Sequence, residues 1–212
     1  MSEPGRLARL RGGFDRMIGA LKADYETQCD FDSRYGGRQG QKPSLLSDVF
    51  KRVGLQVSMA YRVMQFLHEG GVPLAPQVVS RLIRHAYGSD IHWKAQIDPG
   101  IMLVHGMGMA IAPEAKVGQG VLLFHNVTLG SGVHPETRET GAPIIERDVH
   151  IGPGAVIIGP VTIGARSKIM ANCVVMTSVP PDSLVEAPAP NVRPRGVGRS
   201  AKVEGGASRR AR

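Results

Sequence analysis

An aliphatic side chain opens each six-residue unit of this chain between Asp90 and Val179. These positions form three phased runs: Ile91, Ile97, Leu103 and Met109; then, after a short slip, Val117, Leu123 and Leu129; then Ile145, Ile151, Ile157, Ile163, Ile169 and Val175. Small or aliphatic residues recur four places later, at Ala95, Ile101, Met107, Val121, Val127, Val149, Ala155, Val161, Ser167, Cys173 and Val179. A helix has a period near 3.6 and a half-buried strand a period of 2, so neither produces this spacing. Three hexapeptides close one coil of a parallel β-helix, and the pattern therefore predicts a mainly β fold of that kind.

Helical periodicity replaces the six-residue repeat ahead of Asp90. Ser44 is a candidate N-cap, and an apolar stripe follows it until Gly70 and Gly71: Leu46, Val49, Phe50, Val53, Val57, Ala60, Met64 and Leu67. Further helices are predicted over about 13–28 and 76–87. The open end of a β-helix exposes unpaired backbone and an apolar bore, so these helices are expected to cap it. We predict a flexible N-terminus over 1–12, an α-helical cap over 13–88, a β-helix over 89–190 and a basic disordered tail over 191–212.

The net charge of +8 is concentrated at the carboxyl end. Residues 196–212 carry five basic residues and one acidic residue, so their net charge of +4 is half of the net charge of the chain. This glycine-rich segment lacks aromatic residues, so we interpret it as a solubilising tail and expect no specific nucleic-acid partner.

No apolar run approaches a membrane span and no apolar leader follows the amino terminus, so we expect a cytoplasmic protein without a membrane partner. The two cysteines, Cys29 and Cys173, have no metal-type spacing and are read as a surface thiol and a core residue.

Histidine is the best candidate for the chemistry, because the repeat contains few other bases or nucleophiles. His105 occupies the third, outward-pointing place of its hexapeptide, and the small residues after it leave room for a ligand. Asp90 stands fifteen residues earlier, and a coil of about eighteen residues returns the chain to nearly the same corner. A carboxylate there would orient the imidazole. His125 holds the same third place on a later coil and is the rival base.

The stretch Asp90-Ile91-His92, the run Gly100-Ile101-Met102-Leu103-Val104-His105 and the continuation Val127-Thr128-Leu129-Gly130 resemble the serine O-acetyltransferases of the hexapeptide-repeat superfamily. The resemblance implies a left-handed parallel β-helix and acetyl-CoA as the donor, without a metal. It also implies a homotrimer, possible dimers of trimers, and active sites between subunits. His105 matches the family's general base and Asp90 the aspartate that holds it.

Other site residues are carried over by position. Asp32 matches an aspartate that contacts the amino-acid acceptor, and the acceptor pocket is further expected to use His125, His134 and Arg138. Ser131, Pro153 and Ala171 match positions that contact the coenzyme, while Lys168, Arg193 and Arg195 are available for its phosphates.

Two departures from the family bear on the acceptor. Val104 stands where the family has an acidic residue, and the arginine that binds the amino-acid carboxylate has no clean counterpart, although Arg138 lies in the same loop. L-serine or a related small amino acid is therefore the first hypothesis, and a sugar or a biosynthetic intermediate with the same chemistry is the second. The third is a binding or structural β-helix, or a hydratase similar to the gamma-class carbonic anhydrases; the latter needs a His-x4-His spacing that the seven histidines lack.

Overall fold

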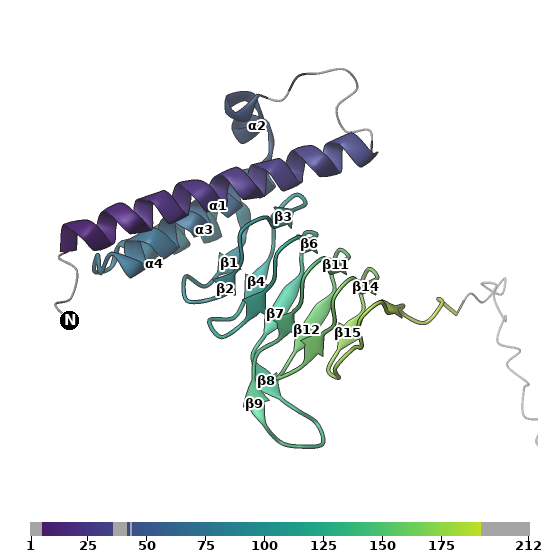
Figure 1. Cartoon of the computed structure of the whole chain (residues 1–212). Coiled ribbons are helices and arrows are strands. Elements are labelled where there is room, and N and C mark those ends of the chain that lie inside the picture. Colours follow the sequence, from purple (N-terminus) through teal and green to yellow (C-terminus); the bar gives the residue numbers. More distant parts are fainter. Residues whose placement is uncertain (1–5, 36–41, 43, 192–212) are drawn as a thin grey trace, which may run out of the picture.

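The computed structural model describes residues 6–35, 42 and 44–191. Within these ranges, helices come first and short strands follow (Figure 1). The helices are α1 (Arg6–Tyr35), α2 (Leu45–Lys51), α3 (Val53–Glu69) and α4 (Ala75–Tyr87). The strands are β1 (Asp90–Ile91), β2 (Gln96–Ile97), β3 (Met102–Leu103), β4 (Ala110–Ile111), β5 (Lys116–Val117), β6 (Leu122–Leu123), β7 (Thr128–Gly130), β8 (Gly132–Val133), β9 (Thr140–Gly141), β10 (Ile144–Ile145), β11 (His150–Ile151), β12 (Val156–Ile158), β13 (Thr162–Ile163), β14 (Lys168–Ile169), β15 (Val174–Val175) and β16 (Leu184–Val185).

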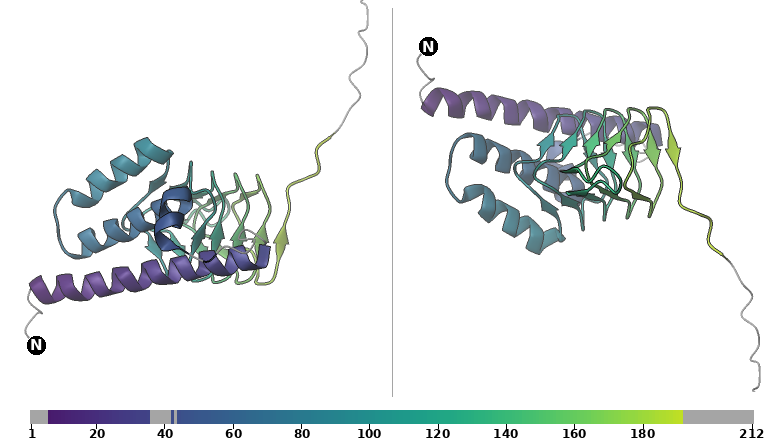
Figure 2. Two further views of the ribbon diagram at one scale, coloured as in Figure 1. Left: turned by 90° about the horizontal axis from the view of Figure 1, so that it is seen from above. Right: turned by 90° about the horizontal axis from the view of Figure 1, so that it is seen from below.

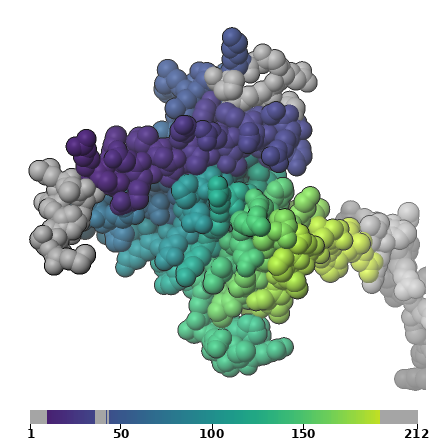
Figure 3. Space-filling model, in the orientation of Figure 1, coloured from purple at the N-terminus to yellow at the C-terminus, as the bar shows by residue number. Residues whose placement is uncertain are grey.

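The strands form three parallel sheets that are the faces of a β-helix. The first sheet has the order β1-β4-β7-β12-β15, the second β13-β10-β5-β2 and the third β16-β14-β11-β6-β3. Strands β8 and β9 form a separate antiparallel hairpin, which leaves the coils between the first and second sheets and projects from the body (Figure 3). The parallel β-helix predicted from the six-residue period is confirmed.

The apolar residues that open the hexapeptides fill the bore of the coils. Ile145, Ile151, Ile157 and Ile163 are at most 1% exposed, and the residues four places later, such as Val149 and Ala155, are equally buried. Cys173 is also buried among them, outside any disulfide, and its thiol donates to the carbonyl oxygen of Val185. Each coil therefore contributes aliphatic side chains to one continuous core.

The slip in the six-residue repeat, which the sequence placed between Met109 and Val117, lies earlier in the structure. Asp90 pairs with Ala110, so this coil is two residues longer than the one in which Ile145 pairs with Ile163. The extra residues fall between β3 and β4. Ile111 takes the opening place of its hexapeptide, Met109 is buried beside it, and Met107, expected to point inward, is 46% exposed.

Helix α3 closes the open end of the β-helix, as the cap hypothesis required. Val57, Tyr61 and Met64 are buried against the first coils. The Tyr61 hydroxyl donates to the carbonyl oxygen of Ala95 at 2.6 Å and accepts the N–H of Ile97 at 3.2 Å, so it satisfies backbone groups of the first coil that have no strand beyond them. Burial raises the pKa of this hydroxyl above its ordinary value, which keeps it protonated as a donor.

A buried ion pair fastens α1 to the same end. Asp24 and Arg62 are 2% and 3% exposed, and Nε of Arg62 lies 3.0 Å from Oδ2 of Asp24. The carboxylate also accepts the Ser58 hydroxyl and the backbone N–H groups of Gly100 and Ile101. Arg62 in turn donates to the carbonyl oxygens of Ile97 and Asp98. The pair therefore compensates its own desolvation by bonding the edge of the first coil.

The helical segment differs from its prediction in three ways. The single stripe expected after Ser44 is broken at Arg52, whose extended backbone separates α2 from α3, and Leu46 and Phe50 are consequently 73% and 78% exposed. Ser44 precedes α2 but makes no side-chain cap. Helix α1 begins at Arg6 and ends at Tyr35, beyond both predicted ends, and it runs along the side of the coils in both views of Figure 2. The predicted tail and Arg193 and Arg195 lie outside the described residues.

No helix in the described ranges is long and apolar enough to cross a membrane.

Candidate active site

His105 lies in the corner that carries the two extra residues. Its φ is 68°, in the left-handed region that a histidine tolerates better than most non-glycine residues. The corner is held from two directions. The Ser89 hydroxyl, just after α4, donates to the carbonyl oxygen of Gly106 at 2.6 Å, and the α3 backbone packs so closely that a Cβ on Gly106 would overlap Gly54. The sequence break at the slip thus builds a loop that presents an exposed imidazole.

A pocket of about 340 Å³ opens beside this imidazole, between the cap and the corner. We call it the cap pocket. Its walls come from α1, from the junction of α2 and α3, and from β3 with the His105 loop, and include Gln28, Asp32, Lys51, Arg52, Val104 and His105. The volume is at the small end of ligand pockets, which suits a small acceptor.

Asp32 lies in the cap pocket but is bonded to an arginine. Nη1 of Arg52 donates to Oδ1 of Asp32 at 3.0 Å, and Nη2 lies 2.8 Å from Oδ2. Gln28 Nε2 also donates to Oδ1, at 3.2 Å. The carboxylate is 5% exposed and the arginine side chain 28% exposed. Asp32 therefore lines the same pocket as His105, with a partner that the sequence did not indicate.

His125 lies one coil beyond His105. The two imidazole rings meet edge to face with centroids 5.5 Å apart. Nδ1 of His125 is buried and has no hydrogen-bond partner among the described residues. The structure thus brings the predicted base and its rival together.

The same corner continues down the solenoid through two of the predicted coenzyme positions. The N–H of Gly154 donates to the carbonyl oxygen of His125 at 3.1 Å, and the N–H of Asn172 donates to that of Pro153 at 2.9 Å. His105, His125, Pro153 and Ala171 consequently occupy successive coils along one edge, between the third and first sheets. Lys168 is exposed on the neighbouring strand β14. Ser131 lies on the other edge of the first sheet, where its hydroxyl donates to Glu114 at 3.0 Å.

Asp90 is engaged elsewhere. Its Oδ1 accepts Nη2 of Arg84, at the end of α4, at 2.6 Å, and both side chains are about half exposed. The described residues contain no hydrogen bond between Asp90 and His105. The pairing of these two residues stays a prediction.

His134 and Arg138 lie in the β8–β9 hairpin, at the far edge of the first sheet from His105. Nδ1 of His134 accepts the backbone N–H groups of Glu136 and Thr137, so this ring stabilises its own turn. Arg138 is exposed at the tip, in a left-handed conformation. One chain by itself does not bring these residues to the cap pocket.

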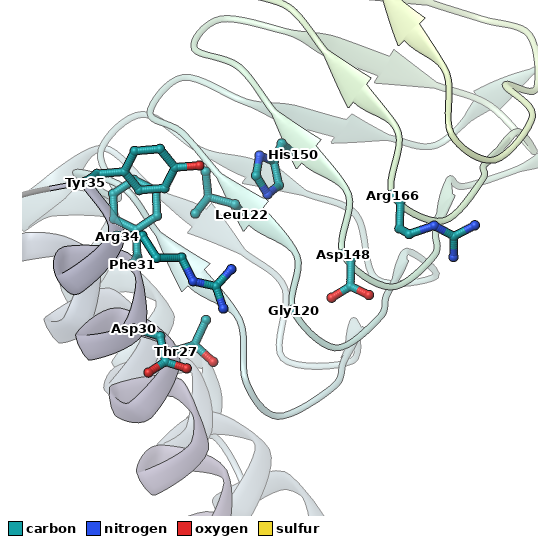
Figure 4. Close-up of a pocket in the computed structure, with 10 residues that line it drawn as sticks. All are labelled: Thr27, Asp30, Phe31, Arg34, Tyr35, Gly120, Leu122, Asp148, His150 and Arg166. Carbon is teal, nitrogen blue, oxygen red and sulfur yellow. The ribbon is translucent and has the colours of Figure 1, made fainter.

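A second pocket, of about 400 Å³, lies between the carboxyl end of α1 and the third sheet (Figure 4). Asp30 and Arg34 of α1 line one side of it and Asp148, His150 and Arg166 of the coils line the other, and the Arg34 side chain extends toward the coils. Burial and the neighbouring Lys168 lower the pKa of His150. None of the predicted site residues that the structure describes lines this pocket.

The described ranges also hold no group of three His, Cys, Asp or Glu residues placed to bind a metal.

Four residues that shape the site were missed. Gly54 and Ser89 fix the His105 corner, Arg52 binds Asp32, and Arg84 binds Asp90. The one available signal was the basic dipeptide of Lys51 and Arg52 inside a predicted apolar stripe.

Comparison with known proteins identifies the class. Residues 142–177 match the bacterial transferase hexapeptide family, described as six repeats. The structure superposes on a serine acetyltransferase of Neisseria gonorrhoeae in complex with serine, with a TM-score of 0.71, 25% identity and coverage of 88% of this chain and 73% of that chain. The chain therefore has the hexapeptide-repeat fold, with the predicted left-handed β-helix.

Relatives narrow the class to a family. The chain is 33% identical to serine acetyltransferase of Helicobacter pylori over 131 residues, which covers 61% of this chain and 75% of that protein. It is 34% identical to serine acetyltransferase of Mycobacterium tuberculosis over 149 residues, 70% of this chain and 64% of that protein. The chain belongs to the serine acetyltransferase family. It spans 53–64% of the length of the Mycobacterium tuberculosis and Synechococcus elongatus relatives.

Proposed function

We propose that this protein is an acetyl-CoA-dependent O-acetyltransferase that acts on the hydroxyl of L-serine or a related small amino acid. The observation that carries this proposal is the position of His105: an exposed imidazole on a braced left-handed corner, at the mouth of a small pocket, in line with Pro153 and Ala171. The family relationship supports the same reaction, because the named relatives are serine acetyltransferases.

His105 acts as the general base in this proposal. A hydroxyl attacks a thioester poorly unless its proton leaves as the bond forms, and imidazole is suited to accept that proton near neutral pH. The acceptor oxygen bonds to the acetyl carbonyl carbon, and His105 takes the hydroxyl proton. The carbon–sulfur bond then breaks and the imidazolium returns the proton to the CoA thiolate, so the reaction releases one ester and one free thiol.

Asp90 is the proposed partner of the His105 ring, where it would fix the tautomer and stabilise the imidazolium. Its carboxylate must first turn away from Arg84, its partner in the isolated chain. Breaking an ion pair between half-exposed side chains costs about 0–1 kcal/mol, so this rearrangement is energetically small.

The donor site is proposed to run along the corner of Pro153 and Ala171, with Lys168 and Arg193 available to its phosphates. Ser131, His134 and Arg138 lie across the first sheet from that corner. A homotrimer brings the far edge of one chain against the near edge of the next, so these residues would reach the site of a neighbouring subunit. Because acetyl-CoA is a metabolite of the cytoplasm, we assign the reaction to that compartment.

A different acceptor is the second candidate. Val104 lines the cap pocket where the family resemblance leads one to expect an acid, and Asp32 is bonded to Arg52. Both observations favour a hydroxyl compound recognised differently from serine, such as a sugar or a biosynthetic intermediate.

A thiol-release assay tests the proposed function. Acetyl-CoA is offered with a panel of hydroxy amino acids, amino sugars and free sugars, and the acetylated product is identified by mass spectrometry. We expect CoA release with a small hydroxy amino acid and an ester on its hydroxyl. Release with sugars alone would favour the second candidate, and no release with any acceptor would reject acetyl transfer.

A further inference from the structure

The cap pocket contains one fixed cation, Arg52, whose placement depends on the break between two helices. Arg52 is the single extended residue between α2 and α3, with φ −117° and ψ 105°. The break directs its guanidinium toward α1, where Asp32 binds it through both terminal nitrogens. Asp48, whose Oδ1 lies 3.7 Å from Nε of Arg52, approaches it from a second side. Two carboxylates therefore hold this guanidinium in one orientation.

The ion pair changes what Asp32 offers a ligand. Both of its oxygens already lie against Arg52, and Gln28 adds a third donor. An ammonium group brought to these oxygens would stand beside the guanidinium, and like charges in a half-buried site repel each other. Val104, which also lines the pocket, offers no anion either. The pocket is therefore poorly suited to hold a ligand through its ammonium group.

Arg52 is suited to the opposite charge. A guanidinium has five N–H donors, and the pair with Asp32 uses one on each terminal nitrogen. Its side chain is 28% exposed and lines the same pocket as His105, with Lys51 beside it. A cation held by buried carboxylates loses little conformational freedom when an anion binds, which favours a carboxylate ligand.

We propose that Arg52 binds the carboxylate of the acceptor and that Asp32 is a positioning residue for Arg52. The acceptor class is then a small hydroxy acid, selected for an anionic group near its hydroxyl and not for a free ammonium group. This inference rests on the proposed acetyl transfer and specifies the acceptor of the same site.

Three acceptors that share a primary hydroxyl separate the role of the carboxylate from that of the ammonium: L-serine, 3-hydroxypropanoate without the ammonium, and ethanolamine without the carboxylate. With acetyl-CoA and the full chain, we expect 3-hydroxypropanoate to have a kcat/KM at least equal to that of L-serine, because it brings no ammonium group beside the guanidinium of Arg52. Ethanolamine should lose about 10- to 100-fold, the effect of one charge-assisted interaction. Ethanolamine matching L-serine, or 3-hydroxypropanoate losing its activity, would overturn the proposal.

Variants assign the effect to the two residues. Arg52→Gln should raise KM for L-serine and for 3-hydroxypropanoate about 10- to 100-fold and leave kcat within about threefold of the wild-type value. Asp32→Asn should lower kcat/KM for L-serine and 3-hydroxypropanoate by the same factor. A loss confined to L-serine would show that Asp32 holds the ammonium, against the proposal. Arg16→Gln, which removes an exposed ion pair with Glu69 on α1 and α3, is the matched control.

Folding and turnover are separated by two further measurements. Arg52→Gln leaves a buried carboxylate without its cation, so the double variant Asp32→Asn with Arg52→Gln is measured in parallel and should show the same rise in KM. Binding of 3-hydroxypropanoate is followed by NMR titration in the wild type and the double variant. Binding that depends on Arg52, without CoA release from any acceptor, would reject the transfer and keep the carboxylate site. CoA release with binding unaffected by the variant would keep the transfer and reject the role of Arg52.

Discussion

The first turn of α3 touches the β-helix at a point where no side chain fits, because a Cβ on Gly54 would overlap the carbonyl oxygen of Leu103. This contact sets the distance between the cap and the corner that carries His105. Gly54 is the second residue of α3, which starts at Val53 directly after the extended Arg52.

Replacing this glycine tests the contact. Gly54→Ala should lower the free energy of unfolding by about 2–4 kcal/mol, because backbone on both sides must move to admit the methyl group. Gly19→Ala is the matched control, since a Cβ there meets nothing within 4 Å. That variant should gain about 0.5–1 kcal/mol from helix propensity. Denaturant unfolding of both proteins measures the difference, and equal stabilities would show that the cap does not rest on this contact.

The ion pair between Asp24 and Arg62 should be the most sensitive charged pair of the cap. Asp24→Asn leaves a buried arginine without its counter-charge, and the expected loss of unfolding free energy is about 3–5 kcal/mol. Glu69→Gln, in the exposed pair with Arg16, should cost about 0–1 kcal/mol. Chemical denaturation of both variants provides the comparison. A small effect for Asp24→Asn would mean that the bonds to Gly100 and Ile101 are replaced without cost.

His92 provides a spectroscopic titration. Its ring stacks on Trp93 with centroids 4.0 Å apart, and Trp93 is the single tryptophan of the chain. Burial, followed by the charge of Lys94, lowers the pKa of His92 from 6.5. Protonation places a positive charge against the indole, so Trp93 emission should change with a midpoint below pH 6.5. His92→Gln should abolish the transition, and an unchanged curve in that variant would assign the signal to another group.

The sign of the corresponding stability effect follows from the same shift. A histidine whose pKa is lower in the folded state than in the unfolded chain binds fewer protons when folded. Its contribution is present above the unfolded pKa and is lost as the pH falls through the folded value. His92 and His150 both have lowered pKa values, so thermal stability should decrease below about pH 6.5 and decrease less in His150→Gln.

Val104 stands where the resemblance to the family leads one to expect an acidic residue that would bind the ammonium group of L-serine. If L-serine is a substrate, its KM should be in the millimolar range, about 1 mM or above, because an unpaired charge resists transfer into the pocket. Val104→Asp should then raise kcat/KM for L-serine by about tenfold, the effect of one charge-assisted hydrogen bond of ~1.5 kcal/mol. Steady-state kinetics with 3-hydroxypropanoate serves as the control, since that acceptor has no ammonium to gain. A variant that loses serine activity would contradict this picture of the pocket.

The repeat was predictable because it depends on local, periodic burial. Ile145 to Val175 follow one six-residue phase, and every one of these residues lies in the core. The two-residue slip was placed after Met109 for the same reason, although it lies between Leu103 and Ile111: Met109 keeps the six-residue phase and is buried, so the sequence hides the insertion.

The partners of the charged residues were not predictable, because they depend on contacts between distant segments. Arg52 binds Asp32 from the break between α2 and α3, and a stripe of apolar residues gives no indication of that break. Arg84 reaches Asp90 because α4 ends directly above β1. The spacing of the two residues predicted that Asp90 lies near His105, and it gave no indication that Arg84 binds the same carboxylate.

The most direct test of the account compares His105→Ala with His125→Ala in acetyl transfer from acetyl-CoA to the best acceptor of the panel. Loss of a general base lowers kcat by roughly 10²–10⁴-fold, and we predict that loss for His105→Ala with little change in acetyl-CoA binding. His125→Ala should lose less. A His105→Ala enzyme with near wild-type kcat, beside a His125→Ala enzyme that has lost it, would contradict the assignment of His105 as the base.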